Sequence, residues 1–244
     1  DLSLTGDASY ILQAILPYVE KTEHKLWMEQ IRGWQKNDYK PVDSYTELKP
    51  HQIIDEICNQ AGPEAVYVTD VGQHQMWAAQ NVNFKKPRRF ISSGGLGTMG
   101  FGLGAAIGAA VGTGERSVLV TGDGSFGMCL NELTTAVTYN VPVVILLMNN
   151  GVLGMVRQWQ TLFFNKHYSN TILDRKTDFV ALARAFGADG EAVDTVAALD
   201  KAFEHAFSCD GPYVIDCRID KDEFVLPMLP PGGSMDDIIM KVGE

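Results

Sequence analysis

The sequence has little positive charge. Its 244 residues include 20 lysines and arginines against 30 aspartates and glutamates, which gives a formal net charge of −10. A surface of this sign repels the phosphates of nucleic acids and the headgroups of anionic lipids. The composition therefore predicts that neither nucleic acid nor a membrane is a partner.

Cysteines and long apolar runs are also scarce. The four cysteines form no CxxC pair and have no histidine at the spacing of a zinc site. We therefore expect a reducing, cytoplasmic setting. The longest apolar stretch covers residues 99–111, which is shorter than the roughly 18 to 20 residues that span a membrane. We expect a buried helix there instead.

Glycine, in contrast, is abundant and unevenly distributed. Twelve of the 24 glycines lie between Gly94 and Gly127. Glycine is favoured where the backbone approaches another group closely or adopts a positive φ. This stretch is therefore a candidate region for a ligand site.

The pattern along the chain divides it into three parts. Residues 1–49 contain helical patterns and then an irregular segment at 37–47, and are expected to be the end of a central domain and a linker. Residues 50–221 alternate β-branched runs with helical runs, which indicates βα units around a parallel sheet. Residues 222–244 are rich in proline and glycine and are expected to form a C-terminal arm over the active site.

The middle part is predicted to be an α/β domain. Strands are predicted at residues 65–69, 89–92, 117–121, 143–148, 191–193 and 213–218. Helices are predicted near residues 51–60, 101–112, 129–139, 155–164, 178–186 and 197–208. These elements predict a doubly wound, mainly parallel six-stranded sheet with helices on both faces.

Two segments, 95–100 and 122–127, match the G-x-G-x-x-G pattern of dinucleotide sites, each between a strand and a helix. That pattern requires an acidic residue at the end of the next strand, whereas the strand after Gly122 ends in Asn149 and Asn150. Asp123 would also place a carboxylate beside a pyrophosphate, a repulsion that a bridging cation relieves. A nicotinamide dinucleotide-dependent oxidoreductase is therefore a less favoured alternative.

A magnesium site explains the same residues better. Asp123 and Asn150 follow two successive strands, so their oxygens are expected to lie close together. Mg²⁺ prefers one or two protein oxygens combined with water and substrate phosphates. The pattern thus predicts Mg²⁺ with a diphosphate, although an ordinary βα turn would produce the same spacing.

The segment Gly122-Asp123-Gly124 followed by Asn149-Asn150 resembles the GDG…NN motif of thiamine diphosphate enzymes. Four further segments look like the catalytic subunit of acetohydroxyacid synthase (acetolactate synthase): VGQHQMWAAQ at 71–80, SGGLGTMG at 93–100, GMVRQWQ at 154–160 and LPMLPPG at 226–232. The resemblance implies the thiamine diphosphate-binding fold and corresponds to the carboxy-terminal portion of such a subunit.

The resemblance also implies roles for individual residues. The Mg²⁺ ligands would be Asp123, Asn150 and the backbone carbonyl of Val152. Cofactor-binding residues would be Gly72, Gln73, His74, Gly97, Met99, Gly124, Ser125 and Met155. Trp159 would line the substrate pocket. Three of these residues have simpler alternative roles: His74 as the cap of a helix that starts at Gln75, Met99 as a core residue, and Trp159 as a packing residue.

The implied activity is thiamine diphosphate-dependent decarboxylation of pyruvate and its condensation with a second 2-oxo acid, such as 2-oxobutyrate, in isoleucine and valine biosynthesis. The alternative is another thiamine diphosphate-dependent 2-oxo acid decarboxylase or carboligase. Implied partners are further catalytic subunits, as a homodimer or tetramer, and a small regulatory subunit. FAD is expected only in the full-length enzyme.

No catalytic residue is expected in this chain itself. The family glutamate that acts on the cofactor lies in an amino-terminal domain. The 244 residues alone are therefore expected to bind thiamine diphosphate weakly and to be inactive.

Overall fold

The computed structural model describes residues 2–36, 39–173 and 175–242. It divides into two compact units, Asp1–Lys40 and Pro41–Glu244. This division falls before the predicted boundary at residue 49, because Leu48 is only 2% exposed and packs in the core of the second unit. Residues 37 and 38 of the predicted irregular segment and the last two residues of the predicted arm lie outside the described residues.

The first unit consists of short helices with exposed side chains. It contains α1 (Ala8–Ile15), η1 (Leu16–Tyr18) and α2 (Lys25–Gln35). Asp7 begins α1 as an N-cap, its carboxylate accepting a 3.0 Å hydrogen bond from the backbone N–H of Tyr10. None of these helices has a buried residue.

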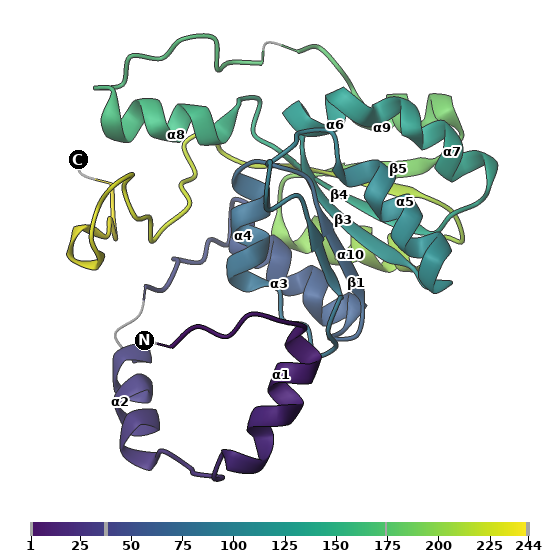
Figure 1. The fold of residues 1–244 in the computed structure, drawn as a ribbon. Helices are drawn as coiled ribbons and strands as arrows, with labels where there is room; N and C mark the ends of the chain where they lie inside the picture. The colour runs from purple at the N-terminus through teal and green to yellow at the C-terminus, as the bar shows by residue number, and fades with distance from the viewer. Residues whose placement is uncertain (1, 37–38, 174, 243–244) are drawn as a thin grey trace. The chain divides into compact units, whose positions relative to one another are not determined.

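The second unit is built on a six-stranded parallel sheet, part of which is labelled in Figure 1. The strand order is β2-β1-β3-β4-β6-β5. The strands are β1 (Val66–Thr69), β2 (Phe90–Ser92), β3 (Ser117–Gly122), β4 (Val143–Asn149), β5 (Asp189–Val193) and β6 (Tyr213–Arg218). The predicted fold class is therefore confirmed, and each predicted strand is present: β6 has the predicted ends, and the other five strands differ from the prediction by one or two residues at an end.

The central strands of the sheet are buried on both faces, and their alternate residues belong to two separate cores. In β4, Ile145 and Leu147 belong to one core, whereas Leu146 and Met148 belong to the other. This is why the strand reads as one continuous apolar run.

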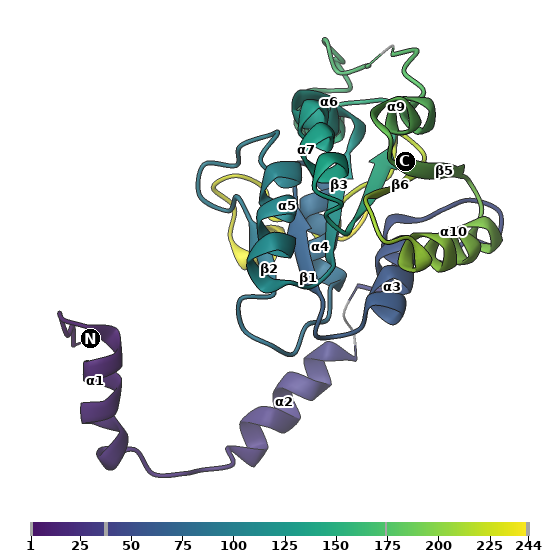
Figure 2. The same ribbon diagram turned by 90° about the vertical axis from the view of Figure 1, so that its right-hand side faces the viewer.

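Helices cover the two faces in separate layers, and α3 and α10 lie side by side in one of them (Figure 2). That layer comprises α3 (Pro50–Ala61), α4 (Gln73–Asn81) and α10 (Val196–Ser208). The other comprises α5 (Gly102–Thr113), α6 (Asp123–Cys129), α7 (Leu133–Thr138) and α9 (Phe179–Phe186). The remaining elements are α8 (Gly154–Phe163), η2 (Leu130–Glu132) and η3 (Met235–Asp237).

Three helices differ from the prediction. Helix α4 begins at Gln73, so the alternative in which His74 caps a helix starting at Gln75 is wrong. The predicted helix at 129–139 starts earlier, at Asp123, and is divided by η2. Helix α5 is buried on one face only, since Gly104 and Gly108 are exposed and a Cβ at either would meet nothing within 4 Å.

None of the helices in the described residues combines the length and the apolarity that crossing a bilayer requires.

Candidate cofactor and metal site

The carboxyl ends of β1, β3 and β4 form one edge of a cavity. These three strands are neighbours in the sheet, so the residues that follow Thr69, Gly122 and Asn149 meet at one place. This is the edge at which open α/β sheets bind ligands. Ten of the twelve predicted site residues line the cavity: Gly72, Gln73, His74, Met99, Asp123, Gly124, Ser125, Asn150, Val152 and Met155.

Asp123 is a buried carboxylate at this edge, 3% exposed. Gly122 pairs with Met148 across the sheet, which sets Asp123 beside the Asn149-Asn150 turn. Burial raises the pKa of Asp123 to about 6, although the positive charge of Arg175 and hydrogen bonds from backbone N–H groups work in the opposite direction. A divalent cation bound here would add positive charge beside this buried carboxylate.

Asn150 has a defined amide orientation. Its Nδ2 donates to Gln73 Oε1 at 3.3 Å, and its Oδ1 accepts from the backbone N–H of Val152 at 3.1 Å. Within the described residues, no cluster of three or more histidine, cysteine, aspartate or glutamate side chains could hold a metal ion. Asp123 and Asn150 provide one carboxylate and one amide oxygen to the cavity, a sparse donor set that fits Mg²⁺ bound jointly with a diphosphate.

His74 lies inside the cavity wall, between two glycines. A Cβ added to Gly72 or Gly122 would come within 2.8 Å of the imidazole ring. Burial lowers the pKa of His74 to about 4, so the ring is neutral at pH 7. Its Nε2 is one of two buried side-chain nitrogen or oxygen atoms in the described residues that have no hydrogen-bond partner. An unpartnered polar atom in a cavity wall fits a polar ligand such as a diphosphate.

Gly124, Met99 and Ser125 also line the cavity. A Cβ on Gly124 would come within 3.1 Å of Leu153 and 3.6 Å of the Met99 methyl group. The Ser125 hydroxyl donates to the backbone carbonyl of Val71 at 2.8 Å, which ties α6 to the segment after β1. Contact between Ser125 and a diphosphate would therefore fall to its backbone N–H.

Gly97 does not line this cavity. It is exposed, with a φ of +61°, in the loop between β2 and α5. The buried Asp70 holds the end of that loop: its Oδ1 accepts from the N–H of Gly100 and its Oδ2 from the N–H of Gly102, both at 2.9 Å. Gly102 has no room for a side chain, because a Cβ would lie 2.8 Å from Asp70 Oδ2 and from Leu119.

Trp159 lines a neighbouring cavity rather than the first one. Both cavities include Met155 and Val156, so they adjoin along α8. Trp159 is 38% exposed and packs edge-on against Phe163, with ring centroids 5.7 Å apart. A packing role and a role in a substrate pocket are thus compatible for this residue.

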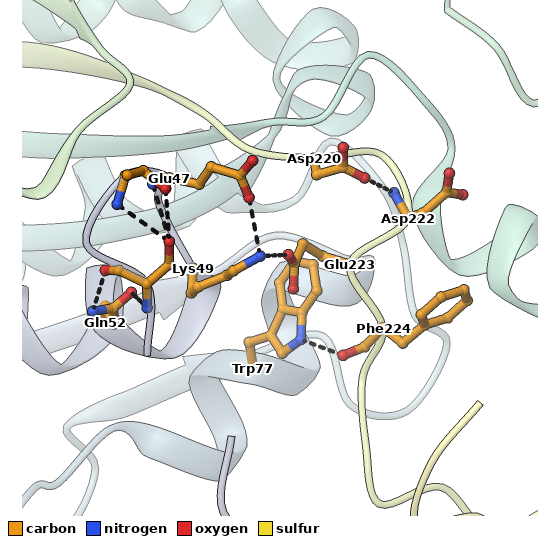
Figure 3. Close-up of polar contacts among 10 residues, drawn as sticks. Glu47, Lys49, Gln52, Trp77, Asp220, Asp222, Glu223 and Phe224 are labelled. Carbon is orange, nitrogen blue, oxygen red and sulfur yellow. Dashed lines mark hydrogen bonds and ion pairs between the residues drawn. The ribbon is translucent and has the colours of Figure 1, made fainter. Parts of the chain in front are cut away.

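The C-terminal arm packs beside the first cavity. The Lys49 ammonium pairs with Glu223 at 2.6 Å, and the Trp77 indole N–H donates to the carbonyl of Phe224 (Figure 3). The side chain of Gln73 donates to Gln158 Oε1 and to the carbonyl of Glu223. Its donors are therefore used within the protein, and contact between Gln73 and a diphosphate would fall to the backbone.

Asp70 and Gln158 are not among the predicted site residues. Both lie in the segments that carry the resemblance or directly beside them, and both are polar residues next to predicted site residues. The contacts that give them a role join them to positions 30 or more residues away in the sequence, at Gly100, Gly102 and Val225. Only the folded chain brings these groups together.

Comparisons with known proteins show which family the chain belongs to. The family model "Thiamine pyrophosphate enzyme, C-terminal TPP binding domain" matches residues 70–217; thiamine pyrophosphate is another name for thiamine diphosphate. Among solved structures, the chain is similar to the thiamine diphosphate-dependent 4-hydroxybenzoylformate decarboxylase of Rhodococcus jostii RHA1. The TM-score is 0.68 at 28% identity, and the match covers 77% of this chain and 36% of that one.

Relatives of known function are more similar in sequence. The chain is 40% identical to the mitochondrial acetolactate synthase catalytic subunit of Saccharomyces cerevisiae, over 98% of this chain and 36% of that protein. It is 39% identical to the acetolactate synthase isozyme 2 large subunit of Escherichia coli, over 99% of this chain and 44% of that protein. The chain thus spans less than half the length of either relative. Because the family model matches more than half of its residues, the chain belongs to the C-terminal, thiamine pyrophosphate-binding domain family of thiamine pyrophosphate enzymes.

Proposed function

We propose that the chain is the carboxy-terminal, cofactor-binding part of an acetolactate synthase catalytic subunit. The observation that carries this proposal is the meeting of Asp123, Asn150 and the unpartnered His74 in one cavity at the ends of β1, β3 and β4. The two acetolactate synthase relatives described above, each similar over nearly the whole chain, support the choice of reaction.

In this proposal the chain's residues bind and orient the cofactor. Asp123, Asn150 and the carbonyl of Val152 hold Mg²⁺, and His74 Nε2 and the backbone at Gly124 face the diphosphate. Met99 and Met155 pack against the cofactor's aminopyrimidine ring and exclude water from it. When bound, thiamine diphosphate supplies the electron sink that decarboxylation of a 2-oxo acid requires.

The cavity around Trp159 accommodates the second 2-oxo acid. It adjoins the first cavity through Met155 and Val156, so a group held against Trp159 lies next to the proposed cofactor site. Pyruvate in this position gives 2-acetolactate, and 2-oxobutyrate gives 2-aceto-2-hydroxybutyrate. Both are precursors in branched-chain amino acid synthesis.

The proposal extends to the rest of the enzyme. Residues 1–49 are the end of a central domain and a linker whose last residues pack on the following domain, residues 50–221 form the diphosphate-binding domain, and residues 222–244 form an arm over the active site. The catalytic glutamate comes from an amino-terminal domain, and FAD binds only in the full-length enzyme. Catalytic subunits assemble as dimers or tetramers in the cytoplasm, with a small regulatory subunit as a further partner.

One alternative has structural support. The Rhodococcus jostii protein, which is named as a decarboxylase, has a similar fold at 28% identity, and fold similarity does not separate decarboxylases from carboligases. The two reactions differ in product. A decarboxylase releases acetaldehyde from pyruvate, whereas a synthase joins two substrates.

The test uses NMR to identify the product that is formed from ¹³C-labelled pyruvate. The chain is fused behind the preceding domains of the S. cerevisiae relative and supplied with thiamine diphosphate and Mg²⁺. We expect labelled acetolactate from the fusion and none from its Asp123→Ala variant. Acetaldehyde as the sole product would favour the decarboxylase alternative. Acetolactate formation by the 244 residues alone would contradict the placement of the catalytic glutamate in another domain.

A further inference from the structure

The C-terminal arm is connected to the proposed metal ligand Asn150 by a row of hydrogen-bonded side-chain amides, which consists of Gln158, Gln73 and Asn150 itself. We define the arm segment as residues 222–228. We propose that Gln158, on α8, is a positioning residue that uses the docked arm segment to fix the orientation of the Asn150 amide, and so sets the affinity for Mg²⁺. This inference rests on the proposed function.

The row begins at the main chain of Val225, which is fully buried. Gln158 pairs with it reciprocally: its Nε2 donates to the carbonyl of Val225 at 3.0 Å, and its Oε1 accepts from the N–H of Val225 at 2.9 Å. Gln158 is 1% exposed, so no water competes for these bonds. A reversed amide would set donor against donor and acceptor against acceptor, and the orientation of Gln158 is therefore fixed.

Gln73 takes its orientation from this pair. Its Nε2 donates to Gln158 Oε1 at 2.9 Å and to the carbonyl of Glu223 at 2.8 Å. Because the NH₂ group of Gln73 faces both acceptors, its amide oxygen points away from them. There it accepts from Asn150 Nδ2 at 3.3 Å.

Two hydrogen bonds together fix which end of the Asn150 amide is available to a cation. Its Nδ2 donates to Gln73 Oε1, and its Oδ1 accepts from the N–H of Val152 and keeps a second lone pair for the ion. A rotated amide would present an NH₂ group to the metal instead of an oxygen, and NH₂ is not a ligand for Mg²⁺. Loss of the row therefore lowers the fraction of molecules that can bind the ion.

Gly154 shows how tightly this row is packed. A Cβ at this position would overlap Gln73 Oε1 and lie 2.7 Å from Asn150 Nδ2. Gly154 and Gln158 both belong to the GMVRQWQ segment at the start of α8. One short segment thus provides both the space for the row and its link to the arm.

The test measures cofactor binding rather than turnover. Thiamine diphosphate is dialysed to equilibrium against the full chain over a series of Mg²⁺ concentrations, and the half-saturating Mg²⁺ concentration is determined. Gln158→Met keeps the length of the side chain but removes its hydrogen bonds. We expect the half-saturating concentration to rise about tenfold, the lower end of the effect of losing a residue that supports a metal ligand.

Gln80→Met is the matched control. Gln80 lies on the same helix as Gln73 and donates to the arm segment at the carbonyl of Leu226, but it does not belong to the row. We expect its Mg²⁺ requirement to equal that of the wild type. Gln158→Asn retains a buried amide that is one methylene too short to reach, so it provides a second test if Gln158→Met does not fold.

The outcomes separate the two proposals. A raised Mg²⁺ requirement in a Gln158 variant, but not in the Gln80 variant, supports the row. Lower thermal stability with an unchanged Mg²⁺ requirement means that Gln158 is only structural and overturns this inference. If the wild-type chain binds no thiamine diphosphate at any Mg²⁺ concentration, the proposed function fails and this inference fails with it.

Discussion

Asp70 offers a sharp test of how the glycine-rich loop is held. Its buried carboxylate accepts three backbone hydrogen bonds: from Val71 at 2.8 Å and from Gly100 and Gly102 at 2.9 Å each. The substitution Asp70→Asn preserves the size of the side chain and leaves one acceptor oxygen. An NH₂ group then faces one of the backbone donors that Asp70 now satisfies.

The expected cost follows from these contacts. Losing one hydrogen bond to a charged group costs about 1.5 to 3 kcal/mol, and leaving a buried donor unsatisfied costs about 1 to 3 kcal/mol. The two costs partly describe the same lost contact, so they do not add in full. A neutral amide is also easier to bury than a carboxylate, which offsets part of the loss. We therefore expect a loss of about 2 to 4 kcal/mol in the free energy of unfolding. For a domain of this size the melting temperature would fall by roughly 5 to 15 °C.

The assay is urea unfolding followed by far-UV circular dichroism, with Asp178→Asn as control. Asp178 also accepts a backbone hydrogen bond, from Ala181 at 2.9 Å, but at an exposed N-cap where asparagine serves equally well. The control is expected to lose less than about 0.5 kcal/mol. Equal unfolding free energies for Asp70→Asn and the wild type would refute the role given to Asp70.

Two further predictions concern the cavity. His74 has a folded-state pKa of about 4, below its ordinary value of 6.5, because it is buried. Between these values the unfolded chain binds the extra proton, so stability should fall as the pH drops from about 6.5 towards 4. His74→Gln should make this fall shallower in urea titrations over a pH series, and superimposable profiles would contradict the burial argument. Gly154→Ala should displace Gln73 and raise the Mg²⁺ needed for cofactor binding in equilibrium dialysis. Gly108→Ala, with open space around its Cβ position, should leave the requirement unchanged, and equal effects of the two variants would contradict the packing argument.

The sheet could be predicted from the sequence because a parallel strand buried on both faces reads as a short, uninterrupted apolar run. The run at residues 143–148 is an example, and it corresponds to β4. Helix α4 was harder to place. Its buried positions include Gln73 and His74, so polar residues occupy part of its inner face and the usual apolar periodicity is absent.

The location of the site could also be predicted, since ligands bind where parallel strands end. Asp123 and Asn150 follow β3 and β4, and they line the same cavity. The supporting contacts could not be predicted. The bonds of Asp70 to the glycine loop and of Gln158 to Val225 join positions 30 or more residues apart, and no local pattern encodes such a pairing.

The glycine cluster has a more specific meaning in the structure than its abundance suggested. Gly122 makes room for the His74 ring, and Gly102 makes room for the Asp70 carboxylate. Gly104 and Gly108 leave an exposed part of the surface of α5 without side chains. Of the two segments that look in the sequence like dinucleotide fingerprints, 122–127 brings its backbone close to the cavity, whereas 95–100 belongs to a loop that reaches the cavity only through Met99.

The central claim is that this cavity binds thiamine diphosphate through Mg²⁺. The most direct measurement is isothermal titration calorimetry of thiamine diphosphate into the chain, with Mg²⁺ and with EDTA in its place. We predict saturable binding with Mg²⁺, which EDTA and the substitution Asp123→Ala each abolish. Binding that EDTA leaves unchanged, or binding of NAD in place of thiamine diphosphate under either condition, would contradict the claim.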